Sequence, residues 1–166
     1  MRDEIRILLD LHAGESYKLG DGTKVALKGN SAEAYTPEAY ASRAKEAKRR
    51  GFDAIKFDID IPTLKSLDPF NHQLTPRGLA QIVEIVAAVR EAVGSDVDVA
   101  IDCHWHFSTS DAIRLAQALE PYDLLWLEDP VRPENVDAMA EVTRSTRTPI
   151  CTGENLYLTY AFRELL

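Results

Sequence analysis

From residue 36 onward, segments with helical periodicity alternate with segments that have strand character, and this alternation restricts the fold more than any other feature. Helical segments repeat apolar residues every three to four positions, whereas strand segments are short runs rich in β-branched and aromatic residues. The sequence predicts helices over residues 36–50, 75–94, 108–119, 133–143 and 157–166. It predicts strands over residues 5–11, 52–59, 97–103, 124–127 and 149–152. Such alternation is typical of parallel strands joined by right-handed crossovers.

Three of the predicted helix starts carry a local signal. Thr36 and Thr75 are each followed by a proline, which favours the first position of a helix. Ser108, with Asp111 three residues later, has the pattern of a capping box.

Two architectures fit parallel strands: an open doubly wound sheet and part of a (β/α)8 barrel. No glycine-rich phosphate loop follows the first strand, which disfavours the dinucleotide-binding open sheet. A closed barrel has eight strands and usually about 250 residues. Five strands in 166 residues therefore predict an incomplete barrel or a smaller open sheet. We expect a single domain, with a first strand and a small hairpin around Gly20-Asp21-Gly22 in residues 1–35, and βα units in residues 36–166.

The net charge of −8 argues against nucleic acid and anionic membranes as partners, because both bind to basic protein surfaces and this chain has no basic stripe to offer them. No apolar run approaches the roughly 20 residues of a membrane span, and Met1-Arg2-Asp3-Glu4 is too polar to open a signal peptide. We therefore expect a cytoplasmic protein. Cys103 and Cys151 show no metal-binding spacing, and we expect both to be buried free thiols.

Charged residues gather where the predicted strands end. Because successive side chains of a strand point to opposite faces, residues two apart share a face. One face of the second strand carries Lys56, Asp58 and Asp60. In the third predicted strand, the residues that share a face are Asp98, Ala100, Asp102 and His104. In the fourth they are Trp126 and Glu128, and in the fifth they are Ile150, Thr152 and Glu154. The carboxyl ends of the strands are where barrel enzymes place their chemistry.

Asp102, Glu128 and Glu154 follow one another at a regular spacing of 26 positions. One βα unit separates each pair, so three neighbouring parallel strands would present these carboxylates side by side. Three anions that close repel one another unless a cation lies among them. Carboxylate oxygens favour a hard ion, with magnesium the first choice and manganese the second.

Each of these residues alone has a simpler explanation. Glu128-Asp129-Pro130 is compatible with a turn and a helix-capping acid, and His104 with a hydrogen-bonded structural group. Asp129, out of phase with Glu128, is compatible with orienting a neighbour. Lys56 is compatible with a salt bridge to Asp58 or Asp102. The metal hypothesis therefore depends on the three acids as a set.

Four segments resemble successive strand ends of the mandelate racemase and muconate lactonizing group of the enolase superfamily, and the resemblance covers residues 36–166. The segments are Ile55-Lys56-Phe57-Asp58, Ala100-Ile101-Asp102-Cys103-His104, Trp126-Leu127-Glu128-Asp129-Pro130 and Thr152-Gly153-Glu154-Asn155. The resemblance implies an incomplete (β/α)8 TIM-type barrel of about five βα units, without the N-terminal capping domain of that group.

The resemblance also assigns roles to six residues. It implies that Asp102, Glu128 and Glu154 bind Mg²⁺, with Mn²⁺ as an alternative. Lys56 matches the first lysine of the family's Lys-x-Lys pair, and Asp58 occupies the place of the second lysine, which is the usual base. His104 is similar to the histidine that protonates the departing hydroxyl group in acid-sugar dehydratases.

The activity implied is dehydration of a sugar acid to a 2-keto-3-deoxy acid, through an enolate intermediate. Alternatives are a racemase or epimerase of the same group, a non-catalytic barrel fragment, and an unrelated small metal-binding α/β domain. The family's later barrel strands, one of which usually carries a catalytic histidine, have no counterpart in this sequence. We therefore expect little activity from the chain alone. We also expect self-association through two open sheet edges.

Overall fold

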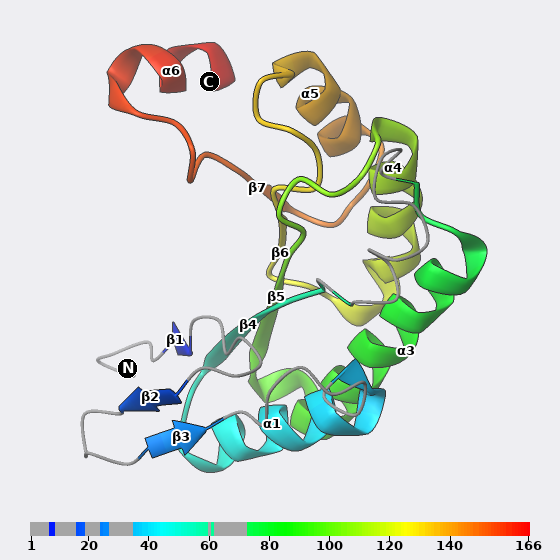
Figure 1. Cartoon of the computed structure of the whole chain (residues 1–166), viewed down its shortest axis with the longest axis vertical. Helices are drawn as coiled ribbons and strands as arrows, with labels where there is room; N and C mark the ends of the chain where they lie inside the picture. Colours follow the sequence, from blue (N-terminus) through cyan, green and yellow to red (C-terminus); the bar gives the residue numbers. More distant parts are fainter. Residues whose placement is uncertain (1–6, 9–15, 19–23, 27–34, 60, 62–72) are drawn as a thin grey trace.

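The computed structural model describes residues 7–8, 16–18, 24–26, 35–59, 61 and 73–166 (Figure 1). Its centre is a five-stranded parallel sheet in the order β1-β4-β5-β6-β7. The strands are β1 (Ile7–Leu8), β4 (Ala54–Asp58), β5 (Asp98–Asp102), β6 (Trp126–Glu128) and β7 (Ile150–Cys151). The helices are α1 (Pro37–Arg49), α3 (Pro76–Val93), α4 (Thr109–Leu119), α5 (Val136–Arg144) and α6 (Leu158–Leu165).

The strand order follows the chain order without a reversal. A doubly wound sheet reverses its order at a switch point, whereas barrel strands follow one another around the axis. Helices α1, α3, α4 and α5 lie along one side of the sheet (Figure 1). The expected incomplete barrel is confirmed, and the open doubly wound sheet is not.

The two strands of the predicted hairpin are paired, while the turn expected around Gly20-Asp21-Gly22 lies outside the described residues. Strands β2 (Ser16–Lys18) and β3 (Lys24–Ala26) pair antiparallel, and they form a separate two-stranded sheet. Parts of the expected hairpin and of the expected first strand lie outside the described residues, as does Asp60.

The local capping signals act as the sequence predicts. The side-chain oxygens of Thr36, Thr75 and Ser108 accept hydrogen bonds from the third following amides, at 3.2, 3.1 and 3.3 Å. Helix α5 begins three residues later than expected, because Asn135 caps it by accepting from the Ala138 amide at 3.0 Å. The start of α5 is therefore set by the side-chain cap of Asn135 and not by the proline at position 133.

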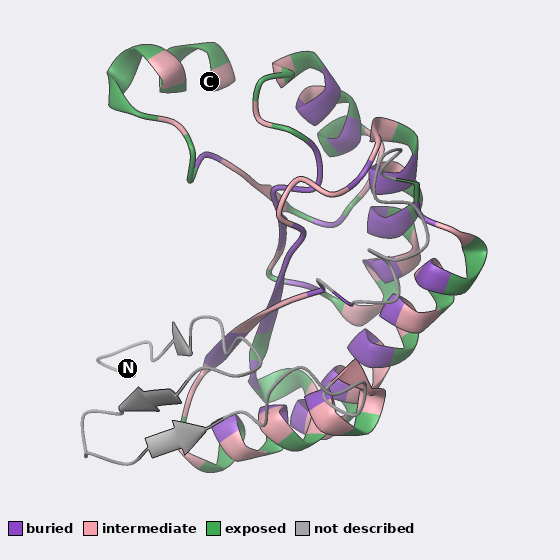
Figure 2. Ribbon diagram, in the orientation of Figure 1, coloured by how far each residue is buried: buried purple, intermediate pink, exposed green. Residues whose placement is uncertain are grey.

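The core lies between the helices and one face of the sheet (Figure 2). Helix α3 buries Ile82, Ile85 and Val86, and β5 buries Val99 and Ile101 in the same cluster. This packing turns the apolar phase of each strand toward the helices and leaves the charged phase on the opposite face. Among the described residues, no helix is long and apolar enough to cross a membrane.

The two cysteines differ in burial. Cys103 is a buried free thiol, as expected, while the free thiol Cys151 is only partly buried at the end of β7. Cys151 is partly covered because β7 is the last strand in the described sheet and has a neighbour on one side only.

Candidate functional site

The carboxyl ends of β5, β6 and β7 bring three acidic side chains together. In the parallel registers, Asp102 is aligned with Glu128. One carboxylate oxygen from each of Asp102, Glu128 and Glu154 lies within 4.8 Å of the other two. Asp102 is 1% exposed and Glu128 9%, whereas Glu154 is on the exposed side of the group. The structure thus brings together the three acids that the 26-residue spacing singles out.

The Lys56 ammonium lies between two of these acids. Its Nζ donates to Asp102 Oδ2 at 2.8 Å and to Glu128 Oε1 at 2.9 Å, and its side chain is 12% exposed. Burial alone would lower the pKa of Lys56, but the two hydrogen-bonded carboxylates raise it above the ordinary lysine value. Lys56 is therefore a fixed cation at neutral pH and is poorly suited to accept a proton.

Two further hydrogen bonds orient the acids. Trp126 Nε1 donates to Glu128 Oε2 at 2.8 Å, which follows from the shared strand face of these two residues. The backbone amide of His104 donates to Asp102 Oδ1 at 3.1 Å. Such contacts fix the direction in which each carboxylate presents its remaining lone pairs.

The acidic group carries more negative charge than Lys56 can balance. Burial raises the pKa of Glu154, and the neighbouring carboxylates raise it further. Burial also raises the pKa of Asp129, against the opposite effect of a hydrogen bond from Thr152. A divalent cation among the three carboxylates would remove the excess charge. The all-oxygen donor set fits Mg²⁺ first and Mn²⁺ second.

A sharp turn after β5 places His104 beside Asp102. His104 and Trp105 have φ angles of +46° and +60°, in the left-handed region that residues other than glycine rarely adopt. The turn brings His104 Nε2 to 3.6 Å from Asp102 Oδ2. Backbone outliers of this kind cluster at functional sites. An imidazole in this position can exchange protons with a molecule bound at the three acids.

Asp58 ends β4 and is aligned with Asp102 in the parallel register. It is half-buried, and its backbone oxygen accepts from the Tyr40 hydroxyl at 3.2 Å. In the described part of the chain, Asp58 is not among the acids whose oxygens gather within 4.8 Å. It therefore lies on the same rim, outside the three-acid group.

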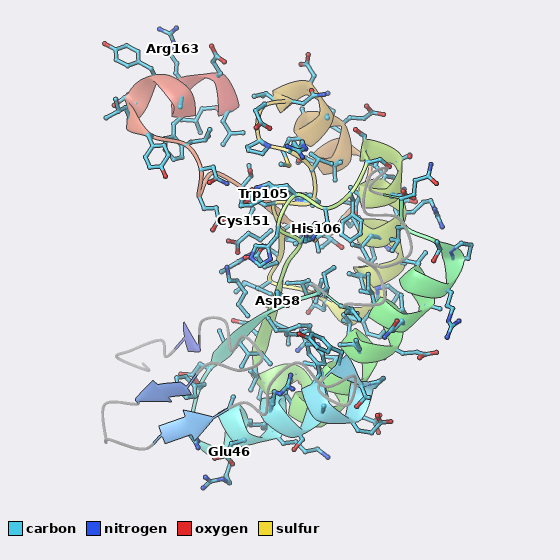
Figure 3. The ribbon with its side chains drawn as sticks, viewed as in Figure 1. Glu46, Asp58, Trp105, His106, Cys151 and Arg163 are labelled. Atoms are coloured by element: carbon cyan, nitrogen blue, oxygen red, sulfur yellow. The ribbon has the colours of Figure 1, made fainter. Side chains whose placement is uncertain are left out.

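An open pocket of about 450 Å³ adjoins His104. It is lined from the loops after β5, β6 and β7 by His104, Trp105, His106, Arg132, Pro133, Glu134 and Asn155. The labelled Trp105, His106 and Cys151 lie near these strand ends in Figure 3. This mixture of hydrogen-bond donors and acceptors suits a small polar molecule.

Sequence reasoning did not select Arg132 or Asn155 as site residues. The one available signal was their position just beyond a strand end, where barrel binding residues lie. The sequence also left the role of Asp129 open. The structure shows that the Asp129 carboxylate accepts a hydrogen bond from the Thr152 hydroxyl. That contact joins two different strand ends, so no local pattern could reveal it.

Comparisons with known proteins agree with the geometry. The sequence profile of the "enolase C-terminal domain-like" family matches residues 39–166. The chain is similar to D-xylonate dehydratase from Haloferax volcanii, at 43% identity over 99% of this chain and 36% of that protein. It is similar to D-gluconate dehydratase from Thermoproteus tenax, at 36% identity over 84% of this chain and 27% of that protein.

Among solved structures, it is similar to a mandelate racemase/muconate lactonizing enzyme-like protein from Rubrobacter xylanophilus. The TM-score is 0.80 and the identity 47%, over 97% of this chain and 40% of that one. The chain thus spans less than half the length of each of these three proteins.

Proposed function

Because the chain belongs to the enolase C-terminal domain-like family, we propose that it supplies the metal-binding rim of a sugar-acid dehydratase. The observation that carries this proposal is the meeting of three carboxylates within 4.8 Å, with His104 3.6 Å from one of them. The relatives named D-xylonate and D-gluconate dehydratase support an aldonate as the substrate. Self-association and a cytoplasmic location stay predictions from the sequence.

In the proposed reaction, Asp102, Glu128 and Glu154 would hold Mg²⁺. The ion, when bound, would offset the negative charge that develops when a proton α to a carboxylate is removed. Lys56 holds Asp102 and Glu128 in place through its two hydrogen bonds. Asp58, at the same rim, occupies the place of the family's second lysine, which is the usual base, and its part in the reaction stays a prediction.

His104 completes the elimination by giving a proton to the departing β-hydroxyl. The α-proton passes to a base, for which Asp58 is the candidate in this chain, the β C–O bond breaks, and the hydroxyl takes the proton from His104 and departs as water. The resulting enol then rearranges to the 2-keto-3-deoxy acid. A positioned general acid of this kind contributes roughly 10²- to 10⁴-fold to a rate. The pocket beside His104 has room for the polar remainder of an aldonate.

The metal site is tested by calorimetric titration of Mg²⁺ into the purified chain and into the Glu128→Gln protein. Loss of one carboxylate from the group of three should weaken Mg²⁺ binding by more than about tenfold, since changes even outside the ligand set often cost that much. Glu91→Gln, on the exposed side of α3, is the matched control and should bind like the unaltered chain. Equal affinities for Glu128→Gln and Glu91→Gln would contradict the metal site.

The reaction is tested by incubating the chain with Mg²⁺ and D-xylonate or D-gluconate in D₂O, followed by mass spectrometry. Little turnover is expected from this chain alone, so the assay needs high protein concentration. The His104→Asn protein should lose dehydration by about 10²-fold or more while it still exchanges the α-proton for deuterium. Inversion at the α-carbon without loss of water would instead favour the racemase alternative, and dehydration unchanged by His104→Asn would refute the assigned role.

A further inference from the structure

Asp129, which directly follows Glu128, joins three consecutive strand ends. Its amide donates to the Cys151 oxygen at 2.9 Å, and its own carbonyl oxygen accepts from the Trp105 amide at 2.8 Å. Its carboxylate Oδ1 accepts from the Thr152 hydroxyl at 2.5 Å. The residue is 1% exposed, and its φ of +43° lies in the left-handed region. A strained and fully covered residue therefore links the segments that follow β5, β6 and β7.

The Thr152 hydrogen bond matters most for Glu154, which lies two residues further on. Gly153 stands between them with a φ of +125°, a conformation open mainly to glycine. A Cβ at Gly153 would lie 3.1 Å from Phe162 Cε1, a tight contact in which the phenyl ring would have to move slightly. Because glycine restrains the backbone least, the placement of Glu154 depends on how firmly Thr152 is held. A hydroxyl bonded to a carboxylate is a strong restraint of this kind.

The Asp129 side chain is unfavourable for the stability of the fold, which suggests that it has a role other than folding. Its carboxylate is buried, and its Oδ2 atom has no hydrogen-bond partner among the described residues. A buried polar atom without a partner destabilises the fold. Its geometry serves a different purpose, because it restrains the two acids on either side of the β6–β7 boundary.

We propose that the Thr152–Asp129 hydrogen bond is a clasp that positions Glu128 and Glu154 to share one cation. Asp129 and Thr152 are positioning residues and not ligands. This inference rests on the proposed metal site, and it adds the element that sets the spacing between the second and third acids. The clasp acts by holding the end of β7 against the end of β6.

The test compares two substitutions at one position in the full 166-residue chain. Thr152→Val removes the hydroxyl and keeps the β-branched shape, whereas Thr152→Ser keeps the hydroxyl. Calorimetric titration with MgCl₂ should show binding weakened by about 10- to 100-fold in Thr152→Val, the usual effect of losing a contact that orients a ligand. Thr152→Ser should restore most of the affinity. Equal affinities for the two proteins would overturn the clasp, as would an unaltered affinity in Thr152→Val.

A second measurement does not depend on metal. Hydrogen exchange of the Trp105 and Asp129 amides in metal-free protein should be faster in Thr152→Val than in Thr152→Ser, with unchanged exchange in α3. Equal exchange rates would overturn the clasp even where no magnesium binds. If the unaltered chain binds no Mg²⁺, the proposed metal site fails, and the exchange rates alone decide on the clasp. If Thr152→Val does not fold, Thr152→Ala takes its place in both comparisons.

Discussion

Lys56 determines the charge balance at the strand-end rim. Its ammonium group contacts two carboxylates, and the side chains of Lys56, Asp102 and Glu128 are 12%, 1% and 12% exposed. Screening by water is weak at this depth, so the ion pairs are stronger than surface pairs. Removing one partner of such a group leaves the others buried without compensation. Lys56 therefore supports the fold of the metal-free chain.

We expect Lys56→Met to lower the free energy of unfolding of the metal-free chain by about 3 kcal/mol, the usual cost of breaking a buried ion pair from one side. Added Mg²⁺ should restore part of the loss, because a bound cation stabilises the folded state. The raised pKa of Lys56 means that its contribution is fully present below the ordinary lysine pKa and is lost only as the pH rises through the raised value. Urea unfolding at pH 7, with and without Mg²⁺, measures both effects.

Lys45→Met is the matched control for that experiment, because Lys45 lies on the exposed side of α1. A surface change of this kind should alter the free energy of unfolding by no more than about 0.5 kcal/mol. Equal stability of the Lys56→Met and Lys45→Met proteins would show that the Lys56 pairs contribute nothing net to the fold.

At the scale of elements, the sequence predicted helix starts well where a side chain caps the helix. Thr36, Thr75 and Ser108 lie at N-caps as expected, because capping depends only on residues three positions apart. The first half of the capping box at Ser108 is present, because the Asp111 amide donates to Ser108 Oγ at 3.3 Å. The Asp111 carboxylate accepts from the Ser108 hydroxyl and also from the Leu74 amide, 37 positions away, at 2.9 Å. That second contact depends on tertiary packing, which no local pattern encodes.

The difference between local sequence patterns and tertiary packing also separates the predictable parts of the site from the unpredictable ones. A period of two along each strand and one βα unit between strands suffice to bring Asp102, Glu128 and Glu154 together. The turn at His104 and Trp105 has no such signal, because residues other than glycine with positive φ are not marked in the sequence. To predict the hydrogen bond between Thr152 and Asp129, one must know how the ends of two neighbouring strands are placed relative to each other.

At the scale of the molecule, the helices cover one side of the sheet, and β1 and β7 are its two outer strands. Helix α6 follows β7 and has no buried residue in the described structure. The segment that begins α6 exposes large side chains, with Tyr157 at 76%, Leu158 at 78% and Tyr160 at 77%. An apolar patch beside an outer strand favours contact with another protein surface.

We expect the purified chain to form dimers or larger assemblies that dissociate on dilution, because this exposed surface adjoins β7, an outer strand of the described sheet. Replacing Tyr157 and Tyr160 together by serine should raise the dissociation constant by roughly 30-fold, since a tyrosine at the centre of an interface is often worth about 1 kcal/mol or more. Sedimentation velocity across a range of concentrations measures this, with Thr159→Ser, on the same helix, as the control. A chain that is monomeric at every concentration would show that α6 and β7 do not mediate association. Association unchanged by the double substitution would place the interface elsewhere on the molecule.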